Sequence, residues 1–218
     1  MTDIEVGYKE KVMYRITDEQ YQARWDWVRE YINNKCIVRD TVMPAKKLGE
    51  TYTWMFYLRR GLFNPDFLIN VGQMFIYKME RLDPTFNFQL TGLETAATPL
   101  LASIPMVAKV MGIDINAFVV RKERKEYGLL NMFEGIPNNK MVVMIDDLCN
   151  SSNSMAKCMH RLHAEGITVA NVAFALVNKS NRDVHEEQRL QTDMYLPPEI
   201  KVVSLFTLDD FDLDNPSH

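Results

Sequence analysis

The feature that most constrains the fold is the run Met141–Ile145, five apolar residues without alternation. Such a run is typical of a strand that is buried on both faces, in the middle of a parallel sheet covered by helices. Asp146 and Asp147 follow at its carboxyl end, where α/β sheets bind their ligands. After a polar loop, apolar residues recur with the spacing of one helix face, at Met155, Cys158, Met159 and Leu162. The sequence therefore predicts a helix N-terminus facing two carboxylates, with Gly166 ending the helix.

Strands and helices are predicted to alternate over the rest of this region. We expect strands near residues 86–91, 115–120, 141–145, 168–177 and 200–207. We expect helices near residues 95–111, 153–165 and 182–190. This order indicates an α/β fold, a mainly parallel twisted sheet with helices on both faces.

The N-terminal part has a different pattern. A capping box at Thr17 starts a helix that is predicted to run to about Asn33, and Pro65 starts a second helix after Asn64. Between them, Thr51–Leu58 is rich in β-forming residues. We expect residues 1–84 to form N-terminal helices and a hood, and residues 85–218 to form the α/β core of a single compact unit.

Composition excludes several classes of function. The chain has 218 residues, of which 47% are hydrophobic and 25% are charged, as in a globular domain. The net charge of −4 argues against a nucleic-acid partner. Three cysteines without C-x-x-C spacing fit a reducing compartment, and no apolar run approaches the ~20 residues that span a bilayer. We expect a cytoplasmic protein without a membrane partner.

The predicted geometry suits a sugar phosphate. Free N–H groups and the dipole of a helix N-terminus attract phosphate, while carboxylates accept hydrogen bonds from sugar hydroxyls. Two alternatives are that the aspartates cap a helix or bind Mg²⁺ in a nucleotide hydrolase. A Walker-type hydrolase is excluded because the chain has no G-x-x-x-x-G-K-[ST] loop. Residues 121–139, a basic run followed by glycines and a proline, are predicted to be a functional or mobile loop.

The acidic segment resembles the motif by which type I phosphoribosyltransferases bind 5-phosphoribosyl 1-pyrophosphate (PRPP), with Asn150–Ser154 in place of the usual Thr-Thr-Gly-Gly-Ser. Three further segments resemble the orotate phosphoribosyltransferase branch, in the right order: Gly61–Asn64, Thr91–Leu100 and Phe118–Gly128. Val202–Phe211 is similar to that family's last strand. The resemblance thus covers most of the chain from about Lys46 onward.

This resemblance implies roles for the acidic pair and the loop. Asp146 and Asp147 would hold the ribose hydroxyls, while Mg²⁺ would be chelated mainly by PRPP and not directly by the protein. The 5′-phosphate would be wrapped by Asn150, Ser151, Ser152, Asn153 and Ser154. Because family glycines in this loop allow a positive φ, we expect Asn150 or Asn153 to adopt the left-handed conformation here.

The resemblance also assigns pyrophosphate and base contacts. Pyrophosphate would be held by Thr95, Ala96, Arg121, Lys122, Lys125 and Tyr127, with Tyr127 at the family's histidine. The alternatives are that Thr95 merely caps a helix and that the basic run is a solvated turn. The family's loop acts partly in the neighbouring subunit, which implies a homodimer. Base contacts are assigned to Lys47, Tyr57 and Asn178, although Asn178 lies where the family has Asp-Arg, and Lys179 or Arg182 could supply the cation.

The implied activity is a Mg²⁺-dependent transfer of ribose 5-phosphate from PRPP to a nitrogenous base, in which Arg121, Lys122, Lys125, Asp146 and Asp147 do the catalytic work. Orotate is the leading base, which would give orotidine 5′-phosphate and pyrophosphate in pyrimidine nucleotide biosynthesis. One alternative is a regulatory protein that binds PRPP or a nucleotide without catalysis. The other is a transferase for a different base.

Overall fold

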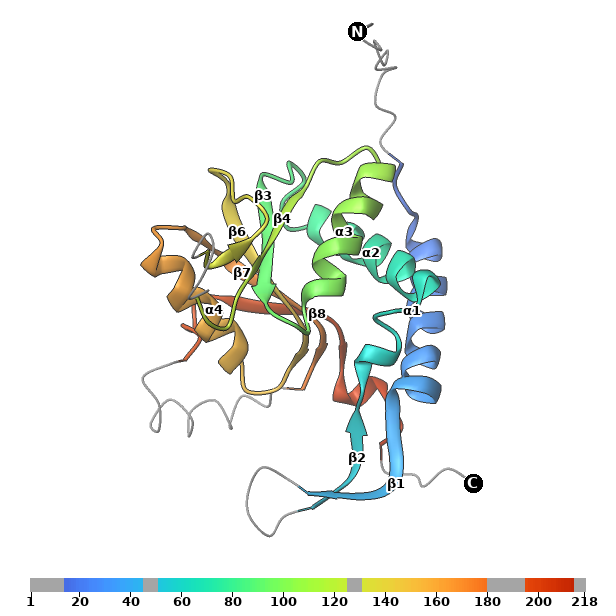
Figure 1. The fold of residues 1–218 in the computed structure, drawn as a ribbon. Coiled ribbons are helices and arrows are strands. Elements are labelled where there is room, and N and C mark those ends of the chain that lie inside the picture. The colour runs from blue at the N-terminus through green and yellow to red at the C-terminus, as the bar shows by residue number, and fades with distance from the viewer. Residues whose placement is uncertain (1–13, 45–50, 125–130, 180–194, 214–218) are drawn as a thin grey trace, which may run out of the picture.

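A six-stranded sheet forms the centre of the computed structural model, which describes residues 14–44, 51–124, 131–179 and 195–213 (Figure 1). In sequence order its strands are β3 (Phe88–Leu93), β4 (Asn116–Val120), β5 (Phe133–Glu134), β6 (Met141–Cys149), β7 (Val169–Asn178) and β8 (Lys201–Thr207). The spatial order is β5-β4-β3-β6-β7-β8, and every pair is parallel except β4 with β5. The predicted mainly parallel sheet is confirmed.

Helices cover both faces of this sheet (Figure 1). The first face carries α1 (Asp18–Tyr31), α2 (Pro65–Glu80) and α3 (Thr98–Val110), and the second carries α4 (Asn153–Ala164). The described residues form two hydrophobic cores, a large one beneath α1, α2 and α3 and a smaller one beneath α4. Among the described residues, no helix is long and apolar enough to span a membrane.

The predicted helix starts are confirmed by their caps. Thr17 Oγ1 accepts the N–H of Gln20 at 3.2 Å, and Gln20 Oε1 accepts the N–H of Thr17 at 3.0 Å. Asn64 Oδ1 accepts the N–H of Phe67 at 2.9 Å, directly before Pro65. These caps satisfy backbone N–H donors that a helix leaves free at its start, so the local sequence is sufficient to predict where both helices begin.

Three segments differ from the sequence prediction. Residues Ile37–Pro44 form an unpredicted strand, β1, which pairs antiparallel with β2 (Thr51–Phe56) in a separate hairpin. β2 stops before Leu58 because a 3₁₀ turn, Leu58–Arg60, begins there. The predicted loop 121–139 contains β5, which is short because only two of its residues pair with β4. The helix expected near residues 182–190 lies outside the described residues.

The topology creates a crevice between β3 and β6. From β3 the chain crosses through α3 to β4 on one side, whereas β6 lies on the other side of β3 and leads through α4 to β7. α/β folds bind ligands at such a switch point, beyond the carboxyl ends of the strands. A Cβ on Gly92 would lie 2.4 Å from the carbonyl oxygen of Ile145, so glycine permits the close approach of β3 and β6 here. The β1–β2 hairpin projects from the same end of the molecule (Figure 1).

Candidate functional site

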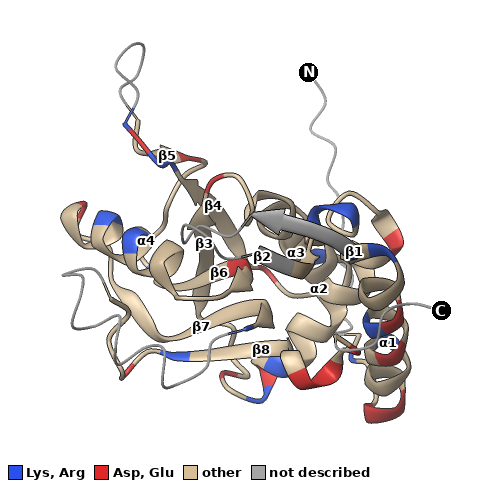
Figure 2. Cartoon of the chain, turned by 90° about the horizontal axis from the view of Figure 1, so that it is seen from below, with Lys and Arg blue, Asp and Glu red and all other residues tan. Residues whose placement is uncertain are grey.

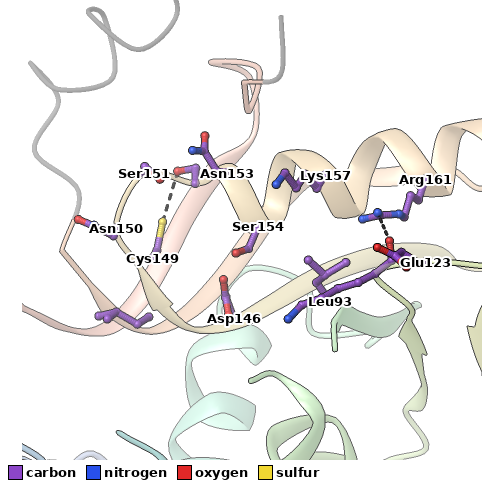
Figure 3. A pocket seen from close by; sticks show the side chains of 13 residues that line it. Leu93, Glu123, Asp146, Cys149, Asn150, Ser151, Asn153, Ser154, Lys157 and Arg161 are labelled. Atoms are coloured by element: carbon purple, nitrogen blue, oxygen red, sulfur yellow. Dashed lines mark hydrogen bonds between the residues drawn. The ribbon is translucent and has the colours of Figure 1, made fainter. Parts of the chain in front are cut away.

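A cavity of about 500 Å³ opens at this switch point (Figure 3). Its floor is the end of β6, one wall is the loop that leads into α4, and another is the start of the basic segment after β4. Asp146 and Ser154 lie opposite each other in it (Figure 3). Of the residues assigned from the sequence, those that line the cavity are Lys122, Asp146, Asn150, Ser151, Ser152, Asn153 and Ser154.

The two aspartates are separated by the pleat of β6. The strand continues past Ile145 to Cys149, with Asp146 opposite Ala175 and Cys149 opposite Asn178 of β7. Successive side chains of a strand point to opposite faces. Asp146 therefore lines the cavity and is 9% exposed, whereas Asp147, half-buried, is not among the lining residues.

Asp146 is held in an environment that disfavours its charge. Its Oδ1 accepts the N–H of Asp147 at 3.0 Å, and Asp147 Oδ1 accepts the N–H of Leu148 at 2.8 Å. Burial raises the pKa of Asp146 above that of an ordinary aspartate, and the negative charge of Asp147 raises it further. Ligand hydroxyls that donate to this carboxylate would stabilise its charged form.

The loop before α4 presents a helix N-terminus to the cavity. Ser152 has a φ of 55°, so it adopts the left-handed conformation that was expected of Asn150 or Asn153, and that expectation was wrong. The Ser152 hydroxyl lies 3.3 Å from the sulfur of Cys149 and makes no cap hydrogen bond with α4. Among the described residues, no side chain therefore caps the first N–H groups of α4, which favours binding of an anion.

Three cations of the described residues line the cavity, and a hydrogen bond links two of them. These cations are Lys122, Lys157 and Arg161, and the carboxylates are Asp146 and Glu123. Arg161 Nη2 donates to the carbonyl oxygen of Lys122, while Arg161 Nη1 is shielded from solvent and has no hydrogen-bond partner among the described residues.

The start of the basic segment is held by contacts with three other parts of the chain. The N–H of Lys122 donates to Glu94 Oε1 at 2.8 Å, and the guanidinium of Arg124 forms an ion pair with Glu165 at the end of α4. Arg121 Nη1 lies 2.8 Å from Glu134 Oε1 and 3.9 Å from Glu94 Oε2, and Arg121 is not among the lining residues. The segment is therefore anchored to the loop after β3, to β5 and to α4.

Some residues assigned from the sequence lie elsewhere. Thr95 and Ala96 line an apolar groove of about 1190 Å³ between α2 and α3. Thr95 is not the cap of α3, since Ala97 occupies that position. Lys47, Lys125 and Tyr127 lie outside the described residues.

The hood meets the core at the end of β7. Asn178 is half-buried there, and the N–H of the next residue, Lys179, donates to the carbonyl oxygen of Cys149 at 2.7 Å. The Lys179 ammonium lies 4.6 Å from the ring centroid of Trp54 in β2, and burial lowers its pKa. Tyr57 is 45% exposed beside the guanidinium of Arg60, and neither Tyr57 nor Asn178 is among the residues that line the cavity.

The sequence interpretation missed Lys157 and Arg161. They follow Asn153 at i+4 and i+8, so the three residues share one face of α4, and all three line the cavity. The opposite face of α4 packs on the sheet. Helical spacing from the loop is the signal that would have found them. Figure 2 shows these basic positions (blue) on α4 and the acidic end of β6 (red).

The polar residues that line the cavity fit a divalent ion that binds together with a phosphate-bearing substrate. Among the described residues, no group of three or more His, Cys, Asp or Glu side chains could hold a metal ion. Mg²⁺ usually keeps several waters and binds through one or two carboxylates plus substrate phosphates. Asp146 in a cavity with an anion-binding helix end is compatible with this arrangement.

Comparison with known sequences finds relatives over most of the chain. No family model matches it. The chain is 32% identical over 155 residues to the orotate phosphoribosyltransferase of Bradyrhizobium sp. strain ORS 278, covering 69% of this chain and 80% of that protein. It is 37% identical over 83 residues to the orotate phosphoribosyltransferase of Tropheryma whipplei, 38% of this chain and 39% of that protein. For that relative and one from Thermosynechococcus vestitus, the chain spans 39% and 53% of the curated length.

Comparison with solved structures supports the fold. The orotate phosphoribosyltransferase of Mycobacterium tuberculosis superposes with a TM-score of 0.67 at 19% identity, covering 86% of this chain and 98% of that one. The six-stranded sheet with helices on both faces is thus the fold of type I phosphoribosyltransferases.

Proposed function

Because the chain belongs to the orotate phosphoribosyltransferase family, we propose that it transfers the ribose 5-phosphate group of PRPP to a nitrogenous base, with orotate as the leading base. The observation that carries this proposal is the cavity in which buried Asp146 faces the uncapped N-terminus of α4. A carboxylate and a free helix end are complementary to the hydroxyls and the phosphate of a ribose 5-phosphate group.

Binding divides the cavity between the two ends of PRPP. Asp146 accepts hydrogen bonds from the ribose hydroxyls, with Asp147 beside it. The loop Asn150–Ser154 and the first N–H groups of α4 donate to the 5′-phosphate. Lys122, at the far wall, interacts with the pyrophosphate. The other proposed pyrophosphate contacts are Arg121, Thr95 and Ala96, which do not line the cavity, and Lys125 and Tyr127, which lie outside the described residues. Both ends of the substrate are held, so the C1′ atom between them is fixed for attack.

In the reaction, a ring nitrogen of the base forms a bond to C1′ and loses its proton to water or to the departing pyrophosphate, while the bond from C1′ to the pyrophosphate oxygen breaks. The electron pair of that bond leaves with pyrophosphate, and the ribose passes through an oxocarbenium-like transition state. Cations of the basic segment stabilise the negative charge that develops on the leaving group. Mg²⁺, bound with PRPP, supplies further neutralisation of that charge. The side chains of this protein act by orientation and electrostatics.

The base occupies the space between hood and core, where Lys47, Tyr57 and Asn178 are the proposed contacts. Lys179 adds a cation at the end of β7, held 4.6 Å from the ring centroid of Trp54. A carboxylate-bearing base such as orotate complements that charge. A cation here supports orotate over a neutral base, and the proposed reaction would belong to pyrimidine nucleotide biosynthesis in the cytoplasm.

The apolar groove between α2 and α3 supports a homodimer. Its lining includes Met106 and Val110, which are 70% and 86% exposed, and such a large apolar surface is unusual on a monomer. The same groove includes Thr95 and Ala96 from the loop after β3. A second copy covering it would therefore reach the pyrophosphate side of the site.

The double substitution Met106→Asp and Val110→Asp should convert the dimer to a monomer, because two charges would have to be buried at the interface. Transferase activity should fall with the loss of the dimer. Sedimentation velocity measures the oligomeric state. The matched control is Leu82→Asp, since Leu82 is 54% exposed but lies outside the groove. A monomeric wild-type protein, or a variant that remains dimeric, would contradict this assignment.

The activity is tested by incubating the protein with PRPP, Mg²⁺ and one base at a time and measuring released pyrophosphate. Release with orotate supports the proposal, and release only with another base names a different transferase. PRPP binding without release for any base would instead favour the regulatory protein. Absence of PRPP binding would refute the proposed function.

A further inference from the structure

The cavity has an imbalance of charge at its phosphate end. The loop Asn150–Ser154 contains no cation, and Asp146 lies across from it. α4 has no acidic residue in its first turn, and the hydroxyl of its cap residue, Ser152, accepts no capping hydrogen bond from the N–H groups at the start of the helix. A phosphate there would meet N–H groups and a helix dipole, but no full positive charge within the loop itself.

Lys157 lies in the position to supply that charge. It is exposed and lines the cavity one turn after Asn153, between the loop and Arg161 (Figure 3). Within the part of the chain that the structure describes, no hydrogen bond or ion pair engages its ammonium group. Arg161, by contrast, is engaged through Nη2 with the carbonyl oxygen of Lys122. A phosphate dianion bound in the cavity would attract this ammonium group directly.

We propose that Lys157 binds the 5′-phosphate of the substrate, as a side-chain ligand in a loop that lacks glycine. One steric and one electrostatic property of the site support this role for Lys157. A loop without glycine cannot bring its backbone as close to a phosphate as a glycine-rich one. A lysine on a flexible four-carbon stem reaches the same phosphate from the adjacent helix turn and contributes a full charge. This inference rests on the proposed function, since it assigns a role within the same substrate site.

The test compares Lys157→Ala with the wild-type protein by calorimetric titration, using ribose 5-phosphate and inorganic pyrophosphate with Mg²⁺ as separate probes. The affinity for ribose 5-phosphate should fall at least about 10-fold, because a charge-assisted contact is lost. The affinity for pyrophosphate should change less than about 2-fold. Lys157→Arg should retain most of the affinity, because the positive charge is kept.

Lys201→Ala is the matched control, since Lys201 is exposed and does not line the cavity. Suppose that the wild-type protein binds PRPP and releases pyrophosphate. If Lys157→Ala then had an unchanged affinity for ribose 5-phosphate, this inference alone would be overturned. An equal loss for both probes would also overturn it. A wild-type protein that binds neither PRPP nor ribose 5-phosphate would overturn the proposed function as well.

Discussion

Replacing Asp146 with asparagine should weaken PRPP binding about 100-fold, because one or two charge-assisted hydrogen bonds to ribose hydroxyls are lost. The local structure should persist, since the Oδ1 of asparagine can still accept the N–H of Asp147. Calorimetry with PRPP and Mg²⁺ measures the loss. Asp147→Asn is the matched control, because Asp147 does not line the cavity, and it should have the smaller effect.

The same substitution should stabilise the ligand-free protein. Since the pKa of Asp146 is raised on folding, the folded protein binds more protons than the unfolded chain above the ordinary aspartate pKa of about 3.9. Asp146 therefore lowers the free energy of unfolding increasingly as the pH rises from there towards its raised pKa. Asp146→Asn has no such titrating group, so its free energy of unfolding should exceed that of the wild type by an amount that grows with pH across that window. Thermal unfolding at several pH values checks this, and an advantage that shrinks with pH would contradict the assigned burial.

Replacing Lys122 with alanine should lower kcat about 100-fold or more and change PRPP affinity much less, because its charge would act mainly on the departing pyrophosphate. The fold of the segment should be preserved. Its contacts with Glu94 and Arg161 use the N–H and carbonyl groups of Lys122, which alanine retains. Steady-state kinetics with PRPP and the active base separates kcat from KM.

Two further variants sharpen the Lys122 result. Lys122→Arg keeps the charge and should recover a large part of the rate. Lys109→Ala removes an exposed lysine that pairs with Asp114 outside the cavity, and its kinetics should match those of the wild type. If Lys122→Ala raised KM with kcat unchanged, Lys122 would bind ground state and transition state equally.

Much of the core could be predicted from sequence because its signals are local or repeated. Val142–Ile145 is buried as predicted, because the run has no polar residue to place on a solvent face, whereas Met141 at the start of the strand is 51% exposed, contrary to the prediction. Thr17 and Asn64 carry their capping partners within three residues. β1 could not be predicted, since its pairing depends on β2 across an intervening segment and not on its own composition.

The sequence predicted which segments form the site, but not the direction of each side chain or the conformation of the loop. Asp146 and the Asn150–Ser154 loop were identified from their place after a buried strand, and they do lie around one cavity. Because β6 continues through Asp146 and Asp147, these two side chains point to opposite faces and only Asp146 lines the cavity. The residue at which a strand ends is poorly predicted from sequence, so this difference was not foreseen. The left-handed residue is Ser152, which is buried and lies 3.3 Å from the sulfur of Cys149, and the intrinsic preference of asparagine for this conformation did not identify it.

The decisive experiment is to follow the formation of orotidine 5′-phosphate from orotate, PRPP and Mg²⁺ by the purified protein through the change in ultraviolet absorbance. We expect the wild type to form this product in an amount equal to the released pyrophosphate, and Asp146→Asn to form almost none. Binding of PRPP without any product from orotate would contradict the claim that this cavity is an orotate phosphoribosyltransferase site.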